Sequence, residues 1–290
     1  MNILSATLLI ISASLAAFRN ILLKSFSPFS FKNREFFGLQ AGIFGVGSVV
    51  LSIVCAVNYN GFSLFTFIVA LIYGAMLLCA QWCYTIALSN GKTAICVTIY
   101  SFGFLIPTLS GAMFWDEEIT IFGALGILII IPVILISGLG KKQSGNGSQS
   151  KSYFIPLILA LLSSGGLGVV QKIQQGSEYK NQTNAFILMA FIFCFIISLL
   201  LFVFLKKGEN KIQRKNLIGC LVVGLTFSTC NLLNTYLAGA LDSAVFFPVL
   251  NICGILLSML LGLIIYKEKL TKKDIVVLIL AFSAIILVNL

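Results

Sequence analysis

Polar side chains recur at helical spacing inside the long apolar runs of this sequence. Gln81 and Tyr84 lie three residues apart in one run, and Asn231 and Asn234 do the same in another. Residues three or four apart share one face of a helix, so each run is expected to present a polar stripe. Amide, hydroxyl and aromatic groups of this kind bind small polar molecules without changing them. Two further runs carry similar groups, and the candidate binding residues are Gln81, Tyr84, Tyr100, Ser101, Asn231, Asn234 and Asn251.

These side chains also have a simpler interpretation. Ser, Thr, Asn and Gln hydrogen-bond neighbouring helices directly within membranes, and for a single residue such as Ser101 that role is the more common one. The amides of Gln81, Asn231, Asn234 and Asn251, taken as a group, instead favour a water-filled cavity. Polar groups at membrane depth are costly unless they have partners or water.

Two basic residues, Arg19 and Lys172, lie at similar depths within apolar runs. Each long side chain can extend to the nearer membrane interface while its stem stays in lipid. The alternative is that one or both offer positive charge to an anionic substrate group or to a gate, so both are kept as candidate binding residues. No carboxylate lies in the middle of a run, which disfavours proton-coupled export of cationic drugs through a membrane-embedded Glu.

Residue types exclude several kinds of enzyme chemistry. The chain has no histidine, and its 8 cysteines all fall in apolar runs, where the thiolate is disfavoured. Cys79 and Cys83 are four apart, but without histidine or a second pair they make a poor metal site. The sequence also lacks a P-loop, Gly-x-Ser-x-Gly and His-Glu-x-x-His. We expect no catalytic residues, no metal and no cofactor; a membrane enzyme would require carboxylates clustered at the membrane surface.

Composition makes lipid the solvent for most of the chain. Of 290 residues, 59% are hydrophobic and 10% are charged, which does not describe a water-soluble globule. A helix needs about 20 apolar residues to cross a bilayer, whereas β-barrel strands alternate apolar and polar residues. The first run lacks the flanks of a cleavable signal peptide, so it is kept as a span. Ten runs are long enough to span: 3–23, 36–57, 64–88, 94–115, 119–138, 153–173, 185–205, 217–238, 244–266 and 275–290.

The chain contains an internal repeat. Residues 68–118 align with 218–268 without a gap, and polar residues fall opposite each other, as Gln81 does on Asn231. Five crossings per copy would deliver the second copy to the membrane upside down. We therefore expect an all-α integral membrane protein of ten transmembrane helices in two inverted five-helix repeats. The expected units are a first repeat at 1–139, a flexible Gly/Ser-rich linker at 140–152 and a second repeat at 153–290.

Basic residues are distributed unevenly between the two ends of the expected spans. All but Lys172 and Lys180 of the 19 basic residues lie in or beside the odd-numbered loops. The positive-inside rule places those loops in the cytoplasm and both termini outside. The same asymmetry accounts for the net charge of +10, so nucleic acid is not an expected partner. The expected partners are a small-molecule substrate and the lipid bilayer, with the protein a monomer or homodimer.

Short motifs at the ends of the runs resemble those of one transporter family. They are Tyr84-Thr-Ile-Ala-Leu88 followed by Lys92-Thr-Ala94, Glu118-Ile-Thr120 with Gly123, and the echo Glu268-Lys-Leu-Thr271. With the five-plus-five arrangement, the chain resembles the EamA-like branch of the drug/metabolite transporter superfamily over nearly its whole length. The resemblance implies alternating access around a central cavity lined by both halves. It also implies cytoplasmic termini, which the charge distribution contradicts.

Together these features predict a multi-pass secondary transporter for a small polar metabolite, working by alternating access through a central cavity. An alternative on the same fold is a lipid-linked-sugar flippase or helper subunit, which a groove open to lipid would indicate. The expected location is the cell membrane, specifically a bacterial cytoplasmic membrane.

Overall fold

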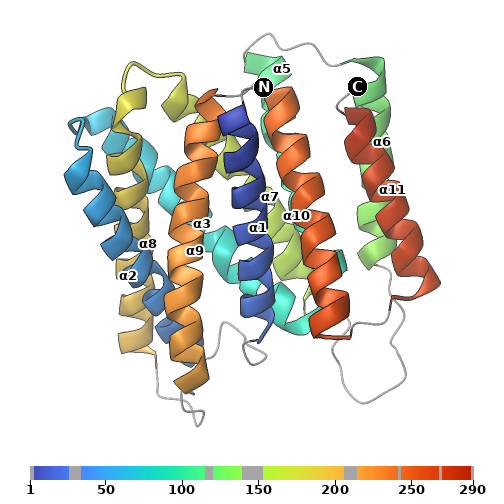
Figure 1. Ribbon diagram of the computed structural model, residues 1–290, viewed down its shortest axis with the longest axis horizontal. Coiled ribbons are helices and arrows are strands. Elements are labelled where there is room, and N and C mark those ends of the chain that lie inside the picture. The colour runs from blue at the N-terminus through green and yellow to red at the C-terminus, as the bar shows by residue number, and fades with distance from the viewer. Residues whose placement is uncertain are drawn as a thin grey trace.

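The computed structural model describes residues 3–25, 34–114, 120–138, 153–205, 214–240, 243–267 and 270–288. Every regular element in these ranges is a helix, which confirms the all-α class. Figure 1 shows the helices side by side, with the start of α1 and the end of α11 at the same end of the molecule. The predicted linker, 140–152, lies outside the described ranges, and the division into two repeats stays a prediction. The α-helices are α1 (Ile3–Ser25), α2 (Arg34–Val57), α3 (Leu64–Asn90), α4 (Thr93–Ser101), α5 (Leu105–Phe114), α6 (Ile121–Gly138), α7 (Phe154–Gln175), α8 (Thr183–Phe204), α9 (Arg214–Ala240), α10 (Ser243–Ile265) and α11 (Lys272–Val288), with 3-10 helices η1 (Phe102–Phe104) and η2 (Lys180–Gln182).

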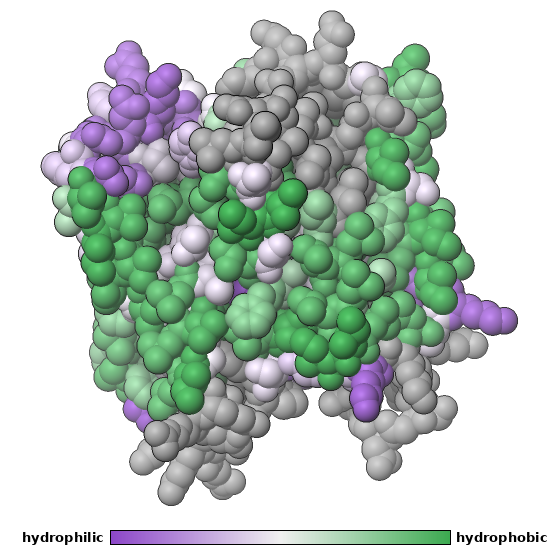
Figure 2. Space-filling view, viewed as in Figure 1, coloured by the Kyte–Doolittle hydropathy of each residue, from purple (hydrophilic) through white to green (hydrophobic). Residues whose placement is uncertain are grey.

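The helices form a multi-pass membrane protein. Figure 2 shows apolar residues over a broad band of the visible face, with hydrophilic residues near the ends of the band. Exposed side chains such as Val57, Leu64 and Phe204 would be costly in water and are suited to lipid. The helices α6, α10 and α11 occupy three of the ten predicted runs. The other predicted runs coincide with 7 segments that are long and apolar enough to cross a membrane: Thr7–Ser25, Arg34–Val57, Leu64–Asn90, Thr93–Gly111, Phe154–Gln175, Lys180–Phe204 and Leu217–Ala240.

The fourth predicted span is broken into α4, η1 and α5. Pro107 has no N–H, and its ring crowds the carbonyl of Gly103, so the α-helical hydrogen-bond ladder is interrupted there. Helix α7 packs closely on this break. A Cβ on Gly103 would lie 2.0 Å from Ser164 Oγ, and one on Gly165 would lie 2.6 Å from the Gly103 carbonyl oxygen. Glycine at both positions therefore allows α7 to contact the broken helix.

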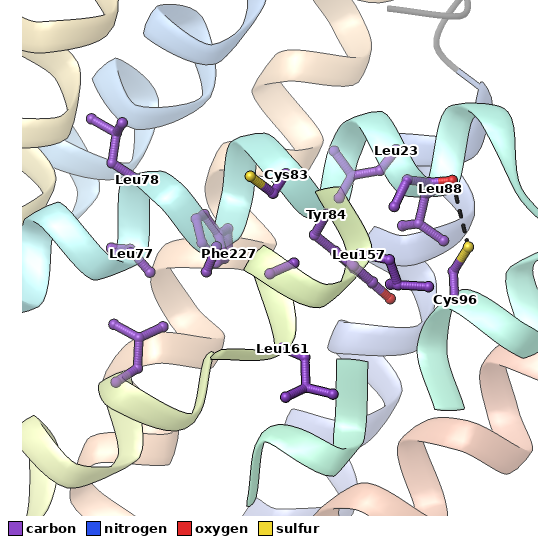
Figure 3. Close-up of a cluster of buried hydrophobic side chains, with 14 of the residues drawn as sticks. Leu23, Leu77, Leu78, Cys83, Tyr84, Leu88, Cys96, Leu157, Leu161 and Phe227 are labelled. Carbon is purple, nitrogen blue, oxygen red and sulfur yellow. Dashed lines mark hydrogen bonds between the residues drawn. The ribbon is translucent and has the colours of Figure 1, made fainter. Parts of the chain in front are cut away.

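Helices from the two halves of the chain pack against each other. α2 packs on α8 and α9, α3 on α7 and α8, and α1 on α9 and α10. The pair α6 and α11 packs together at one side of the bundle, on the right of Figure 1. In the core, the rings of Phe44, Phe191 and Phe227 lie with centroids no more than 5.9 Å apart. Figure 3 shows Leu77 and Tyr84 on α3 in the same core as Phe227 on α9.

Candidate functional site

A cavity of about 190 Å³ lies between six helical segments, α1, α3, α4–α5, α7, α9 and α10. Three of these segments come from each half of the chain. The cavity is smaller than the roughly 300 Å³ at which pockets for drug-sized ligands begin, so its size suits a small metabolite. Most of the predicted binding residues line it, namely Arg19, Tyr84, Tyr100, Ser101, Asn231, Asn234 and Asn251.

Asn231 is held in the cavity wall by a network from three helices. The Tyr73 hydroxyl on α3 donates to Asn231 Oδ1 at 2.9 Å, and Gln171 Nε2 on α7 donates to the Tyr73 hydroxyl at 3.0 Å. Gln171 also donates to Thr235 Oγ1 on α9 at 2.9 Å. Asn231 Nδ2 donates to the Phe227 carbonyl at 2.8 Å. These buried groups satisfy one another, so the network fixes the orientation of the Asn231 amide.

Asn234, one turn further along α9, connects to α1. Ser12 Oγ donates to Asn234 Oδ1 at 2.6 Å, and Cys230 Sγ lies 3.6 Å from the Ser12 carbonyl oxygen. Asn251 on α10 and Ser101 on α4 also line the cavity. This part of the site is therefore rich in uncharged amide and hydroxyl groups.

Arg19 lies two turns beyond Ser12 on α1, about 10 Å along the helix. It is 7% exposed, and its guanidinium carbon lies 4.6 Å from the centre of the Phe227 ring, within cation–π range. Tyr84 and Tyr100 stack with ring centroids 4.1 Å apart, and the Tyr100 hydroxyl lies within hydrogen-bonding reach of Arg19. Arg19 thus stays inside the protein and does not extend to the membrane interface.

The cavity also contains residues that were not predicted from the sequence. Tyr73, Gln171 and Asn20 line it, and Asn20 Nδ2 donates to Ser258 Oγ at 3.1 Å. Shifted by the 150-residue offset of the internal repeat, Tyr73 and Gln171 fall on apolar residues, so comparison of the two copies does not reveal them. The sequence does contain features that could have indicated two of them. Gln171 is an amide within an apolar run, and Asn20 adjoins Arg19.

Residues 151–290, which contain α7 to α11, match the EamA-like transporter family. The second half of the chain is therefore similar to EamA-like transporters. The match confirms the resemblance to the drug/metabolite transporter superfamily that the helix-end motifs indicated. A solved structure, described only as a crystal structure of a protein, is 14% identical with a TM-score of 0.62, covering 98% of this chain and 94% of the other, which shows the fold alone. No curated protein matches the chain.

Two predicted binding residues lie away from the cavity. Leu77 and Tyr84 line it from α3, but Gln81 lies about 60° round the helix from Tyr84 because each residue turns the helix by about 100°. The Gln81 side chain is buried, and its Nε2 has no partner in the described part of the chain. Lys172 is half-buried and follows the lining residue Gln171, so it points about 100° away on α7. The geometry places neither Gln81 nor Lys172 at the cavity.

Polar contacts join the helix ends of the bundle beyond Arg19. The Tyr266 hydroxyl donates to the Ile21 carbonyl at 2.7 Å, which ties the end of α10 to α1. Lys24 on α1 donates to the Gly91 carbonyl between α3 and α4. The Lys24 ammonium also lies 5.8 Å from the centre of the Tyr266 ring. These contacts hold helix ends together at this end, which we call the basic end because the loops there carry most of the lysines and arginines.

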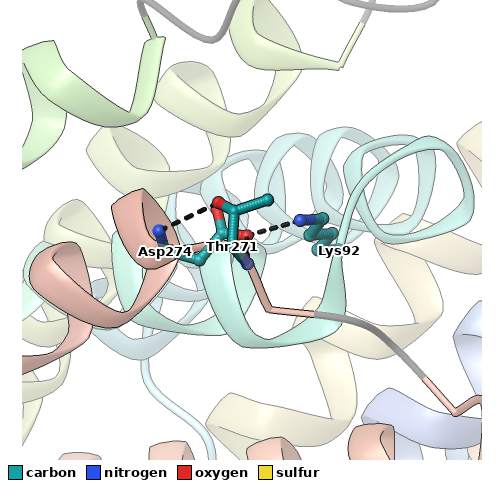
Figure 4. Close-up of polar contacts among 3 residues, drawn as sticks. All are labelled: Lys92, Thr271 and Asp274. Atoms are coloured by element: carbon teal, nitrogen blue, oxygen red, sulfur yellow. Dashed lines mark hydrogen bonds and ion pairs between the residues drawn. The ribbon is translucent and has the colours of Figure 1, made fainter. Parts of the chain in front are cut away.

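An ion pair also joins the two halves at the basic end. Figure 4 shows the Lys92 ammonium contacting the Asp274 carboxylate, with Thr271 beside that carboxylate. The Thr271 N–H donates to Asp274 Oδ2 at 2.8 Å and the Asp274 N–H donates to Thr271 Oγ1 at 3.3 Å, forming a capping box at the start of α11. Burial alone would raise the pKa of the Asp274 carboxyl, but Lys92 and Thr271 together hold that pKa below its ordinary value.

Proposed function

We propose that this EamA-like protein is a secondary transporter that moves a small polar metabolite by alternating access through the central cavity. The observation that carries the proposal is the cavity itself, which is lined by three helical segments from each half of the chain. A site shared between two halves can be exposed to either side of the membrane as the halves move against each other. The amide and hydroxyl groups in its wall suit a polar cargo.

We further propose that the chain crosses the membrane ten times as two inverted five-helix repeats. Helix packing supports this arrangement, because the contacts recur when the halves are exchanged: α1 packs on α9 and α10 as α7 packs on α3 and α4–α5, and α2 packs on α9 as α8 packs on α3. The pairs α2–α8 and α6–α11 map onto themselves, as a two-fold axis requires. The start of α1 and the end of α11 share one end (Figure 1), in agreement with an even number of crossings.

In this proposal the basic end is a closed gate. Three contacts join segments of both halves there: the Tyr266–Ile21 hydrogen bond, the Lys24 ammonium near the Tyr266 ring, and the Lys92–Asp274 pair. They would have to break before a substrate could leave on that side. The positive-inside rule favours the cytoplasm for this end, and a bacterial cytoplasmic membrane is the proposed location.

The geometry supports a transporter better than the alternatives. A lipid-linked-sugar flippase would need a groove that opens to lipid, whereas this cavity lies among six helical segments. A membrane enzyme would need clustered carboxylates. The acidic residues in the described ranges are Glu35 on α2, Glu178 after α7 and Asp274 on α11, and these three belong to separate elements.

Ligand binding followed by exchange tests the proposal. Purified protein in lipid nanodiscs is screened for rises in melting temperature with a library of metabolites, because a ligand that prefers the folded state stabilises it. Each ligand found is then tested in counterflow across proteoliposomes. Asn231→Ala and Asn234→Ala should reduce exchange, while Gln81→Ala, outside the cavity, should not. Exchange that is unchanged in both Asn variants would overturn the cavity as the transport route.

A further inference from the structure

Three buried polar atoms at the Arg19 end of the cavity have no hydrogen-bond partner within the described ranges. They are Arg19 Nε, Asn20 Oδ1 and Tyr84 Oη. All three residues line the cavity, and each is at most 7% exposed. Buried polar groups are nearly always hydrogen-bonded. Three unmade hydrogen bonds around one cavity therefore indicate a subsite that receives a polar ligand.

The charge of this subsite is positive. Among the residues that the structure describes, no Asp or Glu lines the cavity. The Phe227 ring under the Arg19 guanidinium offers a cation–π contact but no negative charge. A buried cation without a counter-charge is costly. An anionic ligand group would supply that charge and the acceptor that Arg19 Nε lacks.

We infer that this subsite binds the carboxylate of a small hydroxy acid, an inference that rests on the proposed transporter function and names its substrate class. Arg19 Nε would donate to one carboxylate oxygen and Tyr84 Oη to the other. Asn20 Oδ1, which can only accept, would take a hydrogen bond from the substrate hydroxyl. Asn20 is oriented for this because its Nδ2 already donates to Ser258. The stacked rings of Tyr84 and Tyr100 form an apolar wall for the carbon skeleton.

The same contacts favour a small hydroxy acid over a phosphate or a ligand that carries an ammonium group. A single guanidinium balances one negative charge, which fits a monocarboxylate better than a doubly charged phosphate. An ammonium group as the donor to Asn20 would be repelled by Arg19 and would find no carboxylate in the described cavity lining. A hydroxyl meets Asn20 Oδ1 without either cost. The volume of about 190 Å³ limits the acid to a few carbon atoms beyond these groups.

The test compares close chemical analogues on the full chain, purified in lipid nanodiscs at pH 7 and constant ionic strength. Melting temperature is measured with lactate and glycolate, and with lactamide and glycolamide, which keep the hydroxyl but lack the charge. Alanine replaces the hydroxyl of lactate by an ammonium group, and inorganic phosphate replaces the carboxylate. We expect at least one of the two hydroxy acids to raise the melting temperature more than all of these analogues.

Substitutions of two basic residues test whether the hydroxy acid binds at Arg19. Arg19→Gln should weaken binding of the hydroxy acid by about 10- to 100-fold, the usual loss for a hydrogen bond to a charged group. Lys172→Gln is the matched control, because Lys172 is a basic residue at similar depth that does not line the cavity. It should leave binding unchanged. Retained binding in Arg19→Gln would overturn the inference.

Melting-temperature shifts of the wild-type protein with the acids and their analogues test the inference even if Arg19→Gln folds poorly. Equal shifts with each acid and its amide, larger shifts with alanine or phosphate, or no shift with either acid would each overturn it. These outcomes are distinct from failure of the proposed function. If an uncharged solute binds and its counterflow is lost in Asn234→Ala, the transporter proposal stands and only the hydroxy-acid assignment falls.

Discussion

The Lys92 ammonium and the Asp274 carboxylate, 182 positions apart in the chain, form an ion pair at the basic end of the bundle. Lys92 lies between α3 and α4, and Asp274 lies in the first turn of α11. Their side chains are 31% and 15% exposed, so water screens the pair only in part. The pair joins the first half of the chain to the second.

The ion pair predicts a defined pH dependence of stability. The pKa of Asp274 is held below its ordinary value in the folded state, so its stabilisation is complete above the unfolded pKa of about 3.9 and is lost as pH falls through the folded pKa. Asp274→Asn should therefore lower the free energy of unfolding by up to about 1 kcal/mol near neutral pH. Thermal unfolding from pH 8 to pH 3 should show a constant difference from wild type above about pH 5 that shrinks at lower pH. Lys92→Met should have a similar effect, and a difference that grew on acidification would contradict the ion pair's role.

Asn231 is predicted to be structural as well as ligand-facing. Asn231→Ala leaves the Tyr73 hydroxyl without its acceptor at a buried site, and such a loss costs about 1–3 kcal/mol. Tyr73→Phe also removes the acceptor of Gln171 Nε2, so the double variant with Asn231→Ala should lose less stability than the sum of the two single variants. The measurement is a double-mutant cycle of unfolding free energy in detergent. Additive effects of the two substitutions would show that their hydrogen bond contributes nothing.

Close packing of α7 on the broken helix predicts contrasting effects of two glycine substitutions. In Gly165→Ala the new Cβ would lie 2.4 Å from Ile106 Cδ1 and 2.6 Å from the Gly103 carbonyl oxygen. Overpacking of this kind costs about 1–3 kcal/mol. Gly254→Ala is the control, since Gly254 lines the cavity and its Cβ would meet nothing within 4 Å. Melting temperatures should fall in Gly165→Ala only, and equal falls in both would refute the packing argument.

The charge distribution predicts which end of the bundle faces the cytoplasm. Glu178 and Lys273 are exposed at opposite ends, and the 8 native cysteines are buried or half-buried. A membrane-impermeant maleimide should label Glu178→Cys in intact cells and Lys273→Cys only after lysis. The native chain provides the background signal. The reverse pattern would place both termini in the cytoplasm, as the family resemblance implies.

Hydropathy and helical spacing are local properties, so the sequence alone determined the features that depend on them. The apolar runs set the helical elements and the membrane as their solvent. The 150-residue repeat and the spacing of Asn231 and Asn234 indicated a polar face on α9, and both residues line the cavity.

Only the tertiary structure decided how these faces are turned toward one another. Gln81 belongs to the same nominal stripe as Tyr84, yet a helix of 3.6 residues per turn carries it out of the cavity wall. Arg19 is buried rather than interfacial because Phe227, distant in sequence on α9, lies beneath its guanidinium. The Tyr73–Asn231 bond likewise joins residues of different helices. Such contacts depend on the rotation and crossing of packed helices, which is set by side-chain interlocking across the whole bundle and not by the residues of one segment.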